Sequence, residues 1–256
     1  MPRSTPGPGR QPLRAVGALA LLLAAAGCTS AAPAGGPTAT SSPAAAGPAA
    51  DRVGQLFLDG LDGPRFCTAS VVHSGGGSLL ITAAHCVAPH GVPVSGLVFA
   101  PGYRDGRAPH GSWPITGVKV DPRWGTGPDD EHYDVAFLTV DRVDGRRIED
   151  VLGAERFSTD GGDTEVTVTG YPNDGNAPIT CRTTAVTAGP NGRRFDCSGF
   201  TDGTSGSPWV TADGRVIGVI GGYQQGGDTA DTSYSPAFDQ RTADLYRQAD
   251  GGTGGS

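Results

Sequence analysis

The sequence is poor in lysine and has no stretch in which positive charge accumulates. Lys119 is its only lysine, and arginine supplies almost all of the basic charge. The 256 residues carry a formal net charge of −7, and residues 1–27 hold three arginines and no acid, so the remainder is more acidic still. Proteins that bind nucleic acid usually present a basic patch. We therefore expect no nucleic-acid partner.

Long apolar runs are also missing. Residues 15–26 (AVGALALLLAAA) form the main one, which is too short to span a bilayer comfortably. A start that carries arginines, a short apolar run and small residues after it are typical of a secretory signal peptide, which we place at residues 1–27. The Cys28 that follows resembles the lipid-modified cysteine of bacterial lipoproteins, although their motif prefers Leu where this chain has Ala25. This resemblance implies an extracellular protein attached to the membrane through Cys28; the alternative is an ordinary secreted protein.

The next segment has no charged and no large apolar residue. Residues 29–50 contain only Ala, Gly, Pro, Ser and Thr, a composition that cannot bury a core. We predict that residues 28–50 form a flexible tether, that residues 51–250 form the folded domain, and that residues 251–256 are a flexible tail.

Cysteines are few, and no C-x-x-C pair occurs. Besides Cys28 there are Cys67, Cys86, Cys181 and Cys197. Four cysteines allow three pairings; the most local one, Cys67 with Cys86 and Cys181 with Cys197, would close loops worth about 3 kcal/mol each. Export permits disulfides. Only His85 adjoins a cysteine, so a zinc site is weakly indicated, and we expect neither a metal nor another cofactor.

Turn-forming residues favour many short strands over long helices. The chain has 42 Gly and 21 Pro, and short apolar segments alternate with turn signals from residue 53 to residue 238. Predicted strands cover residues 66–74, 78–82, 96–100, 115–120, 135–140, 164–170, 183–187, 209–211 and 216–221. Gly75-Gly76-Gly77 and Asp213-Gly214 are predicted hairpin turns. Residues 238–249 have helical composition, so the prediction is an all-β fold with one C-terminal helix.

Two short stretches place a histidine and an aspartate at strand ends. His85 follows small residues in Thr82-Ala83-Ala84-His85-Cys86, and an imidazole can accept and return a proton near neutral pH. Asp134 directly precedes the predicted strand 135–140; behind a histidine, such a carboxylate can fix the tautomer and stabilise the imidazolium. Each residue taken alone is more often structural.

A third stretch, Gly203-Thr204-Ser205-Gly206-Ser207-Pro208, surrounds a serine with glycine. These glycines allow a substrate backbone to approach closely, and they allow the N–H groups of Gly203 and Ser205 to turn toward one point. Two such donors form an oxyanion hole. Taken alone, the stretch also fits a Gly/Ser turn before a strand.

The order His, Asp, Ser is that of chymotrypsin. T-A-A-H-C, Y-D-V-A-F-L and G-x-S-G-S-P resemble the corresponding phrases of the trypsin-like (chymotrypsin-fold) serine peptidases of bacterial type, over roughly residues 51–249. This resemblance implies two six-stranded antiparallel β-barrels with a junction near residues 141–163. It also implies an endopeptidase that forms an acyl-enzyme with a triad of His85, Asp134 and Ser205, and a Cys67–Cys86 bridge beside the histidine.

The same resemblance implies substrate contacts. Gly221, Gly222 and Tyr223 would pair with the substrate backbone, and residues 198–202, with Gly199 and Phe200, would line the pocket for the side chain before the cut bond. Gly199 stands where trypsin keeps a carboxylate, so we expect medium or small apolar side chains there. Thr204 stands where animal members carry an Asp that pairs with a newly cut N-terminus, so activation of that kind is not implied.

Other interpretations fit less well. An α/β-hydrolase needs a histidine after its serine, and the last one here is His132. A subtilisin-like serine opens a helix, whereas residues 208–210 predict a strand. Residues 129–131 are acidic enough for calcium, but a solvated loop is favoured. A catalytically silent trypsin-like domain that binds a partner at the cell surface stays as the alternative; otherwise we expect a monomer that acts on proteins or peptides.

Overall fold

The computed structural model of the chain describes residues 39–127, 130–189 and 192–251. The predicted signal peptide, Cys28, the first part of the predicted tether, Asp129 and residues 252–256 lie outside the described residues. Within the described ranges, no helix combines the length and apolar character needed to cross a membrane.

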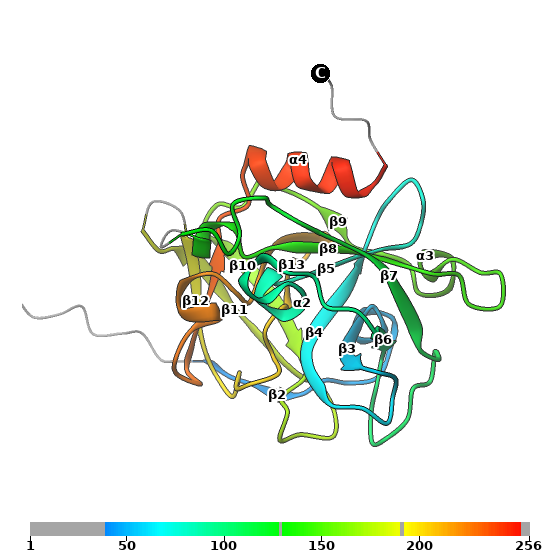
Figure 1. Cartoon of the computed structure of the whole chain (residues 1–256). Coiled ribbons are helices and arrows are strands. Elements are labelled where there is room, and N and C mark those ends of the chain that lie inside the picture. The colour runs from blue at the N-terminus through cyan, green and yellow to red at the C-terminus, as the bar shows by residue number, and fades with distance from the viewer. Residues whose placement is uncertain (1–38, 128–129, 190–191, 252–256) are drawn as a thin grey trace, which may run out of the picture. The chain divides into compact units, whose positions relative to one another are not determined.

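A closed antiparallel barrel makes up the first half of the fold (Figure 1). Its strands are β3 (Val53–Leu58), β4 (Arg65–Val72), β5 (Leu79–Thr82), β6 (Leu97–Pro101), β7 (Trp113–Val120) and β8 (Ala136–Val140), in the order β3-β4-β5-β8-β7-β6. Successive side chains of a strand point to opposite faces. In β5, Leu80 packs inside the barrel, while Leu79 and Ile81 join a second cluster with Val219 of the other half and Leu245 of the C-terminal helix. β5 is thus buried on both of its faces.

A nine-stranded sheet makes up the second half. It contains β1 (Ala39–Thr40), β2 (Ser42–Pro43), β9 (Arg156–Phe157), β10 (Thr164–Gly170), β11 (Ile179–Thr187), β12 (Gly192–Ser198), β13 (Pro208–Thr211), β14 (Arg215–Val219) and β15 (Thr232–Pro236). Its main path runs β1-β12-β11-β10-β13-β14-β9, with β15 on β12 and β2 on β11. After β14, the N–H of Gly221 donates to the carbonyl of Tyr234 in β15 (3.0 Å). The sheet therefore curls back on itself where we expected a second six-stranded barrel.

The helices are short except for the last. They are α1 (Pro48–Asp51), α2 (Ala84–Val87), α3 (Ile148–Leu152) and α4 (Gln240–Ala249), with 3₁₀ turns η1 (Pro89–Gly91), η2 (Asp130–Tyr133) and η3 (Tyr223–Gly226). Asp239 caps α4 by accepting the N–H groups of Arg241 (2.8 Å) and Thr242 (3.3 Å). The predicted all-β fold with one C-terminal helix is confirmed.

The structure corrects the predicted tether at its C-terminal end. β1 lies parallel to β12, and β2 lies antiparallel to β11. Residues 39–50, which we assigned to the tether, therefore contain two strands and the start of α1. A segment without large apolar side chains can still be held in place by backbone hydrogen bonds. Composition alone could not show this pairing.

Both local disulfides are present. Cys67–Cys86 joins β4 to α2, and Cys181–Cys197 joins β11 to β12. Each half of the fold therefore contains one cross-link, and the first one lies next to His85. Disulfides of this kind fit an extracellular protein.

Candidate active site

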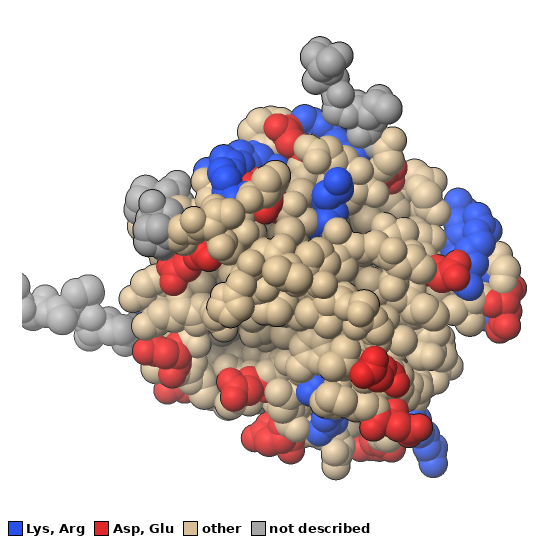
Figure 2. All heavy atoms as spheres, in the orientation of Figure 1, with Lys and Arg blue, Asp and Glu red and all other residues tan. Residues whose placement is uncertain are grey.

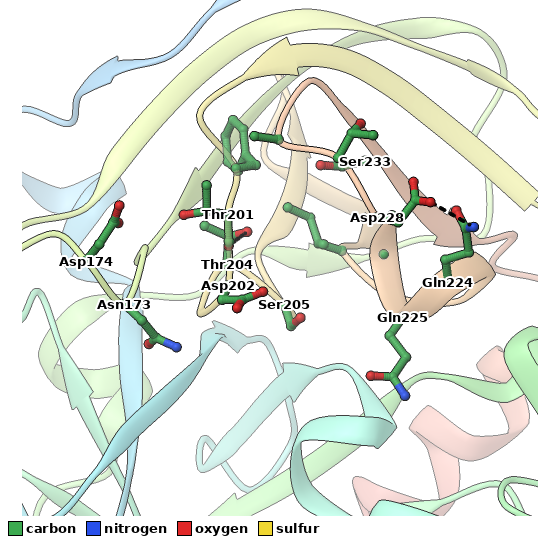
Figure 3. Close-up of a pocket in the computed structure, with 16 residues that line it drawn as sticks. Asn173, Asp174, Thr201, Asp202, Thr204, Ser205, Gln224, Gln225, Asp228 and Ser233 are labelled. Atoms are coloured by element: carbon green, nitrogen blue, oxygen red, sulfur yellow. Dashed lines mark hydrogen bonds between the residues drawn. The ribbon is translucent and has the colours of Figure 1, made fainter.

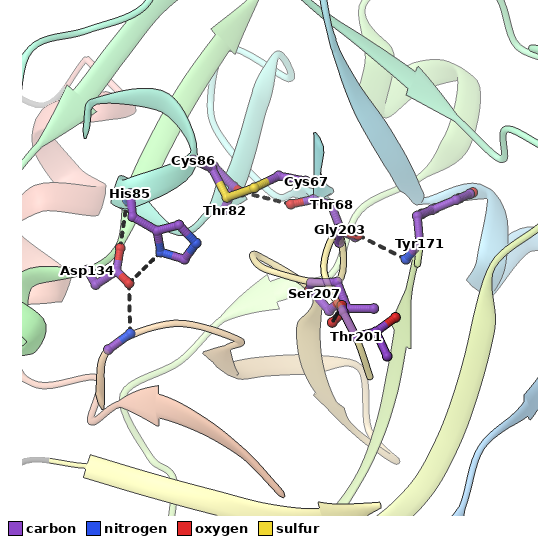
Figure 4. The surroundings of a disulfide bond; sticks show 12 residues. Cys67, Thr68, Thr82, His85, Cys86, Asp134, Tyr171, Thr201, Gly203 and Ser207 are labelled. Atoms are coloured by element: carbon purple, nitrogen blue, oxygen red, sulfur yellow. Dashed lines mark hydrogen bonds and ion pairs between the residues drawn. A yellow bond between two sulfur atoms is a disulfide. The ribbon is translucent and has the colours of Figure 1, made fainter. Parts of the chain in front are cut away.

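His85 and Asp134 form a buried pair. His85 lies in α2, which begins directly after β5 because Ala83 and Ala84 are small enough to be completely buried. Its Nδ1 lies 2.7 Å from Oδ2 of Asp134, and its backbone N–H donates to Oδ1 at 2.8 Å. The N–H of Gly222 also donates to Oδ2 at 2.8 Å. Figure 4 shows these contacts converging on the carboxylate.

This geometry assigns the histidine tautomer. The carboxylate of Asp134 is fully buried, and an ionised carboxylate only accepts hydrogen bonds. The proton between the two side chains therefore belongs to Nδ1 of His85, and Nε2 is left as an acceptor. The imidazole side chain is 12% exposed, so Nε2 can meet a substrate or a neighbouring hydroxyl.

The disulfide beside His85 fixes α2 to β4. The sulfurs of Cys67 and Cys86 lie within 4.8 Å of a ring nitrogen of His85, a spacing that could hold a metal ion. Both sulfurs are committed to the disulfide, so this cluster offers the imidazole as its one free ligand. The cluster is accounted for by the cross-link.

Ser205 lies on a loop that is held from both halves of the fold. The N–H of Thr68 in β4 donates to the carbonyl of Ser205 (2.8 Å), and the hydroxyl of Thr68 donates to the carbonyl of Gly203 (3.0 Å). From the second half, the carbonyl of Ile220 accepts the N–H of Gly206 (2.7 Å). The loop therefore has a fixed position between the barrel and the sheet.

Gly206 brings this loop against the segment that leads into His85. Its φ is +82°, and a Cβ at this position would lie 2.1 Å from Oγ1 of Thr82 and 3.2 Å from the N of Ala83. Only glycine fits such a close approach with such a φ. Ser205 and His85 therefore lie on elements that pack directly against each other.

Two N–H groups of the loop are left available. The N–H groups of Thr204, Gly206 and Ser207 all donate to backbone carbonyls. Within the described part of the chain, no protein acceptor takes the N–H of Gly203 or Ser205. Donors of an oxyanion hole must be free of protein acceptors in this way. Thr204 is 2% exposed, and its hydroxyl donates to the carbonyl of Thr201 (2.7 Å).

A cavity of about 570 Å³ adjoins Ser205 (Figure 3). Its other lining residues are Asn173, Asp174, Phe200, Thr201, Asp202, Thr204, Ile220, residues 224–230 and Ser233. Asn173 and Asp174 lie on one side of Ser205 in Figure 3, and Gln224, Gln225 and Asp228 lie on the other. Asp174, Asp202 and Asp228, which we call the acidic rim, are exposed, whereas Phe200 and Ile220 are buried. The cavity lining thus combines two buried apolar side chains, Phe200 and Ile220, which we call the cavity floor, with the acidic rim.

A second cavity of about 630 Å³ lies beside His85. It is lined by His85, Pro89, His90, Trp124, Asp130, Glu131, Gly222, Gln224 and Gln225. Gln224 and Gln225 line both cavities, so the two adjoin each other along η3. Among the described residues, no Lys or Arg lines either one. The centre of the face in Figure 2, where α2 lies in Figure 1, likewise carries no charged side chain, and both signs of charge are mixed around its margin.

Charged side chains support the segment before Asp134 from outside. The guanidinium groups of Arg123 and Arg241 lie 4.3 and 5.4 Å from the ring centre of Tyr133. Burial alone would raise the pKa of Asp121, but its hydrogen bonds with Arg123 outweigh this and hold that pKa below its ordinary value. Asp121 therefore stays ionised and keeps Arg123 in place.

Only some of the residues predicted to contact substrate line the cavity beside Ser205. Phe200 lines the first cavity, but Gly199 lies outside its lining. Gly221 and Gly222 are buried between Asp134 and β15, and Tyr223 is 53% exposed. We did not predict that residues 224–230 line the cavity. The sequence Gln224-Gln225-Gly226-Gly227 was a turn signal that could have drawn attention to this loop.

The family model for the trypsin-like peptidase domain matches residues 67–219. The chain belongs to the trypsin-like peptidase family. It is a serine endopeptidase by this membership, as predicted, and its substrates are peptides. Among curated protein sequences, no match was found.

Solved structures of two proteases and of a heparin-binding protein resemble the peptidase across most of its length. Protease Anisep from Arthrobacter nicotinovorans is 24% identical with a TM-score of 0.67, and covers 78% of this chain and 96% of its own. The thermostable serine protease AL20 from an extremophilic microorganism is also 24% identical, with a TM-score of 0.70 and 81% and 100% covered. Human heparin binding protein (CAP37), in a mutant form, is 17% identical with a TM-score of 0.61 and 84% and 95% covered. These likenesses confirm the chymotrypsin-like fold.

Proposed function

We propose that the peptidase is exported and hydrolyses peptide bonds through an acyl-enzyme, with Ser205 as nucleophile, His85 as general base and Asp134 as the group that orients His85. The observation that carries this proposal is the 2.7 Å contact between Nδ1 of His85 and the buried Asp134, next to a serine loop packed against the same strand end. This is the arrangement that a serine hydrolase needs.

The chemistry follows from the tautomer. Ser205 Oγ attacks the carbonyl carbon of the scissile bond while Nε2 of His85 takes its proton, and Asp134 stabilises the resulting imidazolium. The N–H groups of Gly203 and Ser205 bind the oxyanion, and one such donor is worth about 3–4 kcal/mol in a comparable site. Nε2 then gives its proton to the leaving amine as the C–N bond breaks. Water attacks the ester, and His85 again acts as base.

The substrate backbone is proposed to pair with the segment after β14. The N–H groups of Gly221 and Gly222 are used by Tyr234 and Asp134, so the carbonyl of Gly221 is the group left to accept a hydrogen bond from the substrate. The side chain before the cut bond would enter the cavity above Phe200. The apolar floor supports the expected medium or small apolar side chain, and the acidic rim disfavours an acidic one.

Activation by an ion pair at Thr204 is not supported. Thr204 carries no charge, and its hydroxyl is already satisfied by the carbonyl of Thr201. We propose that the domain folds directly into its active form. If a chain that was never cut is inert, and trimming near Asp51 restores activity, this proposal is wrong.

Labelling by a fluorophosphonate probe tests the nucleophile without knowledge of the substrate. We expect the full chain to be labelled at Ser205, and Ser205→Ala to lose both labelling and peptide hydrolysis by several orders of magnitude while its thermal melting is unchanged. Ser42→Ala is the matched control, because Ser42 is an exposed serine far from Ser205 in the sequence. A wild-type chain that melts cooperatively but is not labelled would instead support the catalytically silent binding module.

Export and lipid attachment are tested separately. We propose that Cys28 carries a lipid that holds the domain at the outer face of the membrane. Cys28→Ser should release the peptidase into the medium with unchanged specific activity. If wild-type protein is already free in the medium, the lipid proposal fails and simple secretion remains.

A further inference from the structure

Residues 39–44, which we call the N-terminal strap, lie between the diverging ends of two strands of the second sheet. β11 and β12 pair directly at residues 186–187 and 193–194. Toward the cavity the strap pairs with both of them instead. β1 is parallel to β12, with the N–H of Ser41 donating to the carbonyl of Ser198 (3.1 Å), and β2 is antiparallel to β11.

The strap contacts the residue directly before the cavity floor. Gly199 has a φ of +100°, and a Cβ there would lie 2.3 Å from Oγ and 3.4 Å from Cβ of Ser41. The side chain of Ser41 thus occupies the space that any larger residue at position 199 would need. The next residue, Phe200, is 4% exposed and lines the cavity beside Ser205. Ala39 of the strap packs against the same hydrophobic cluster as Phe200.

The same backbone is held from its other edge by the cavity loop. The N–H of Gly199 donates to the carbonyl of Ala230 (2.8 Å), and the N–H of Cys197 donates to that of Asp231 (2.9 Å). Ala230 itself lines the cavity. The backbone of residues 197–199 therefore lies between the strap and the cavity loop, and the strap is one of its two supports.

We propose that the N-terminal strap is a positioning element for the substrate pocket: its pairing with Ser198 fixes Gly199 and Phe200, and with them the shape of the cavity floor. This inference rests on the proposed function for its kinetic consequence. His85, Asp134 and Ser205 are held by other contacts, through Gly222 and Thr68. Loosening the strap therefore weakens binding of the substrate side chain and leaves the nucleophile reactive.

Ser41→Pro in the full chain tests the proposal, because proline removes the N–H that donates to Ser198. We expect KM for a peptide substrate to rise about tenfold, a ratio in the range for one lost hydrogen bond that leaves a carbonyl unpaired. We expect kcat and the rate of fluorophosphonate labelling to stay within about threefold of wild type, because the lost contact acts equally on the bound substrate and the transition state, and the triad is held by other contacts. Hydrogen exchange at the amide of Gly199 should become faster. Ser41→Gly, which keeps the N–H, and Ser42→Ala are the controls and should behave as wild type.

The outcomes separate this inference from the proposed function. An active wild type with unchanged KM and unchanged exchange in Ser41→Pro would overturn the role of the strap. A parallel fall of labelling and peptide hydrolysis would also overturn it, because the effect would then not be confined to the pocket. If wild type is neither labelled nor active, the proposed function fails. In that case, hydrogen exchange at the amide of Gly199 still tests whether the strap fixes the cavity floor.

Discussion

Replacing Asp134 by Asn perturbs the site where its geometry is most constrained. The carboxylate accepts three N–H groups: Oδ1 takes the backbone N–H of His85 at 2.8 Å, and Oδ2 takes Nδ1 of His85 at 2.7 Å and the N–H of Gly222 at 2.8 Å. An amide offers one acceptor oxygen, and its NH₂ only donates. In either orientation of the Asn side chain, at least one N–H faces another donor.

The magnitude follows from counting these donors. If the amide oxygen keeps the backbone N–H of His85, its NH₂ faces Nδ1, which must then accept, and the proton moves to Nε2. Nε2 can then no longer take the proton of Ser205. In the other orientation the tautomer survives, but the negative charge that stabilises the imidazolium is still lost. We expect kcat to fall by about 10⁴, as in the chymotrypsin-type triad, which corresponds to about 5.5 kcal/mol. The unpaired N–H should cost about 1–3 kcal/mol of folding stability.

The assay is kcat and KM for an activated ester, measured with thermal melting of the same samples. Asp130→Asn is the matched control, because Asp130 lines the cavity beside His85 and its substitution removes the same charge. The control should keep its activity within about threefold. If Asp134→Asn keeps more than a tenth of wild-type kcat, or if both variants lose the same activity, the assigned role of Asp134 is refuted.

Two further substitutions and one substrate preference test other contacts of the structure. Gly206→Ala should abolish labelling of Ser205 and lower the Tm, because the new Cβ would lie 2.1 Å from Oγ1 of Thr82 at a φ of +82°; wild-type melting would show that the loop can move. Asp239→Asn should lower the Tm at neutral pH: burial alone would raise the pKa of Asp239, but hydrogen bonds from Arg241 and the N–H of Thr242 outweigh this and lower it. A carboxyl whose pKa is lowered in the folded state stabilises the fold above about pH 4, and this stabilisation is lost as the pH falls through the folded-state pKa. The Tm difference between wild type and Asp239→Asn should therefore shrink below about pH 4. A difference that stays constant with pH would contradict this. A peptide library should rank Glu and Asp last before the cut bond because of the acidic rim, and about 0.5 M salt should narrow the gap to neutral residues; a dominant Glu preference would contradict this.

Local signals predicted the elements whose side chains alternate strongly. β10 has the predicted bounds, Thr164–Gly170, because its valines alternate with Thr and Glu and are buried at every second position. β12 was not predicted, because its charged residues hide the pattern. Arg193 is 4% exposed and next to the exposed Arg194, so a buried arginine stands where an apolar residue would have signalled a strand. Its strand conformation depends on pairing with β11 and β15.

The candidate site likewise contains residues that the sequence predicted and residues that it did not. His85, Asp134 and Ser205 stand in short phrases whose residue types are chemically restricted, so the sequence predicted them. The cavity wall formed by residues 224–230 was not predicted, because its approach to Ser205 depends on how β14 and β15 come together. The contact from Gly222 to Asp134 was missed for the same reason, since a backbone N–H has no signature in the residue type.

The pairing of β1 with β12 also sets how far the enzyme could act from a membrane. The first described strand begins at Ala39, which is eleven residues after Cys28. Eleven residues span at most about 40 Å when fully extended. If Cys28 carries a lipid, this short connection keeps the second sheet close to the bilayer. The enzyme would then encounter proteins on the membrane surface at a high local concentration. Hydrolysis would depend on which proteins are present at that surface rather than on those that diffuse through the medium.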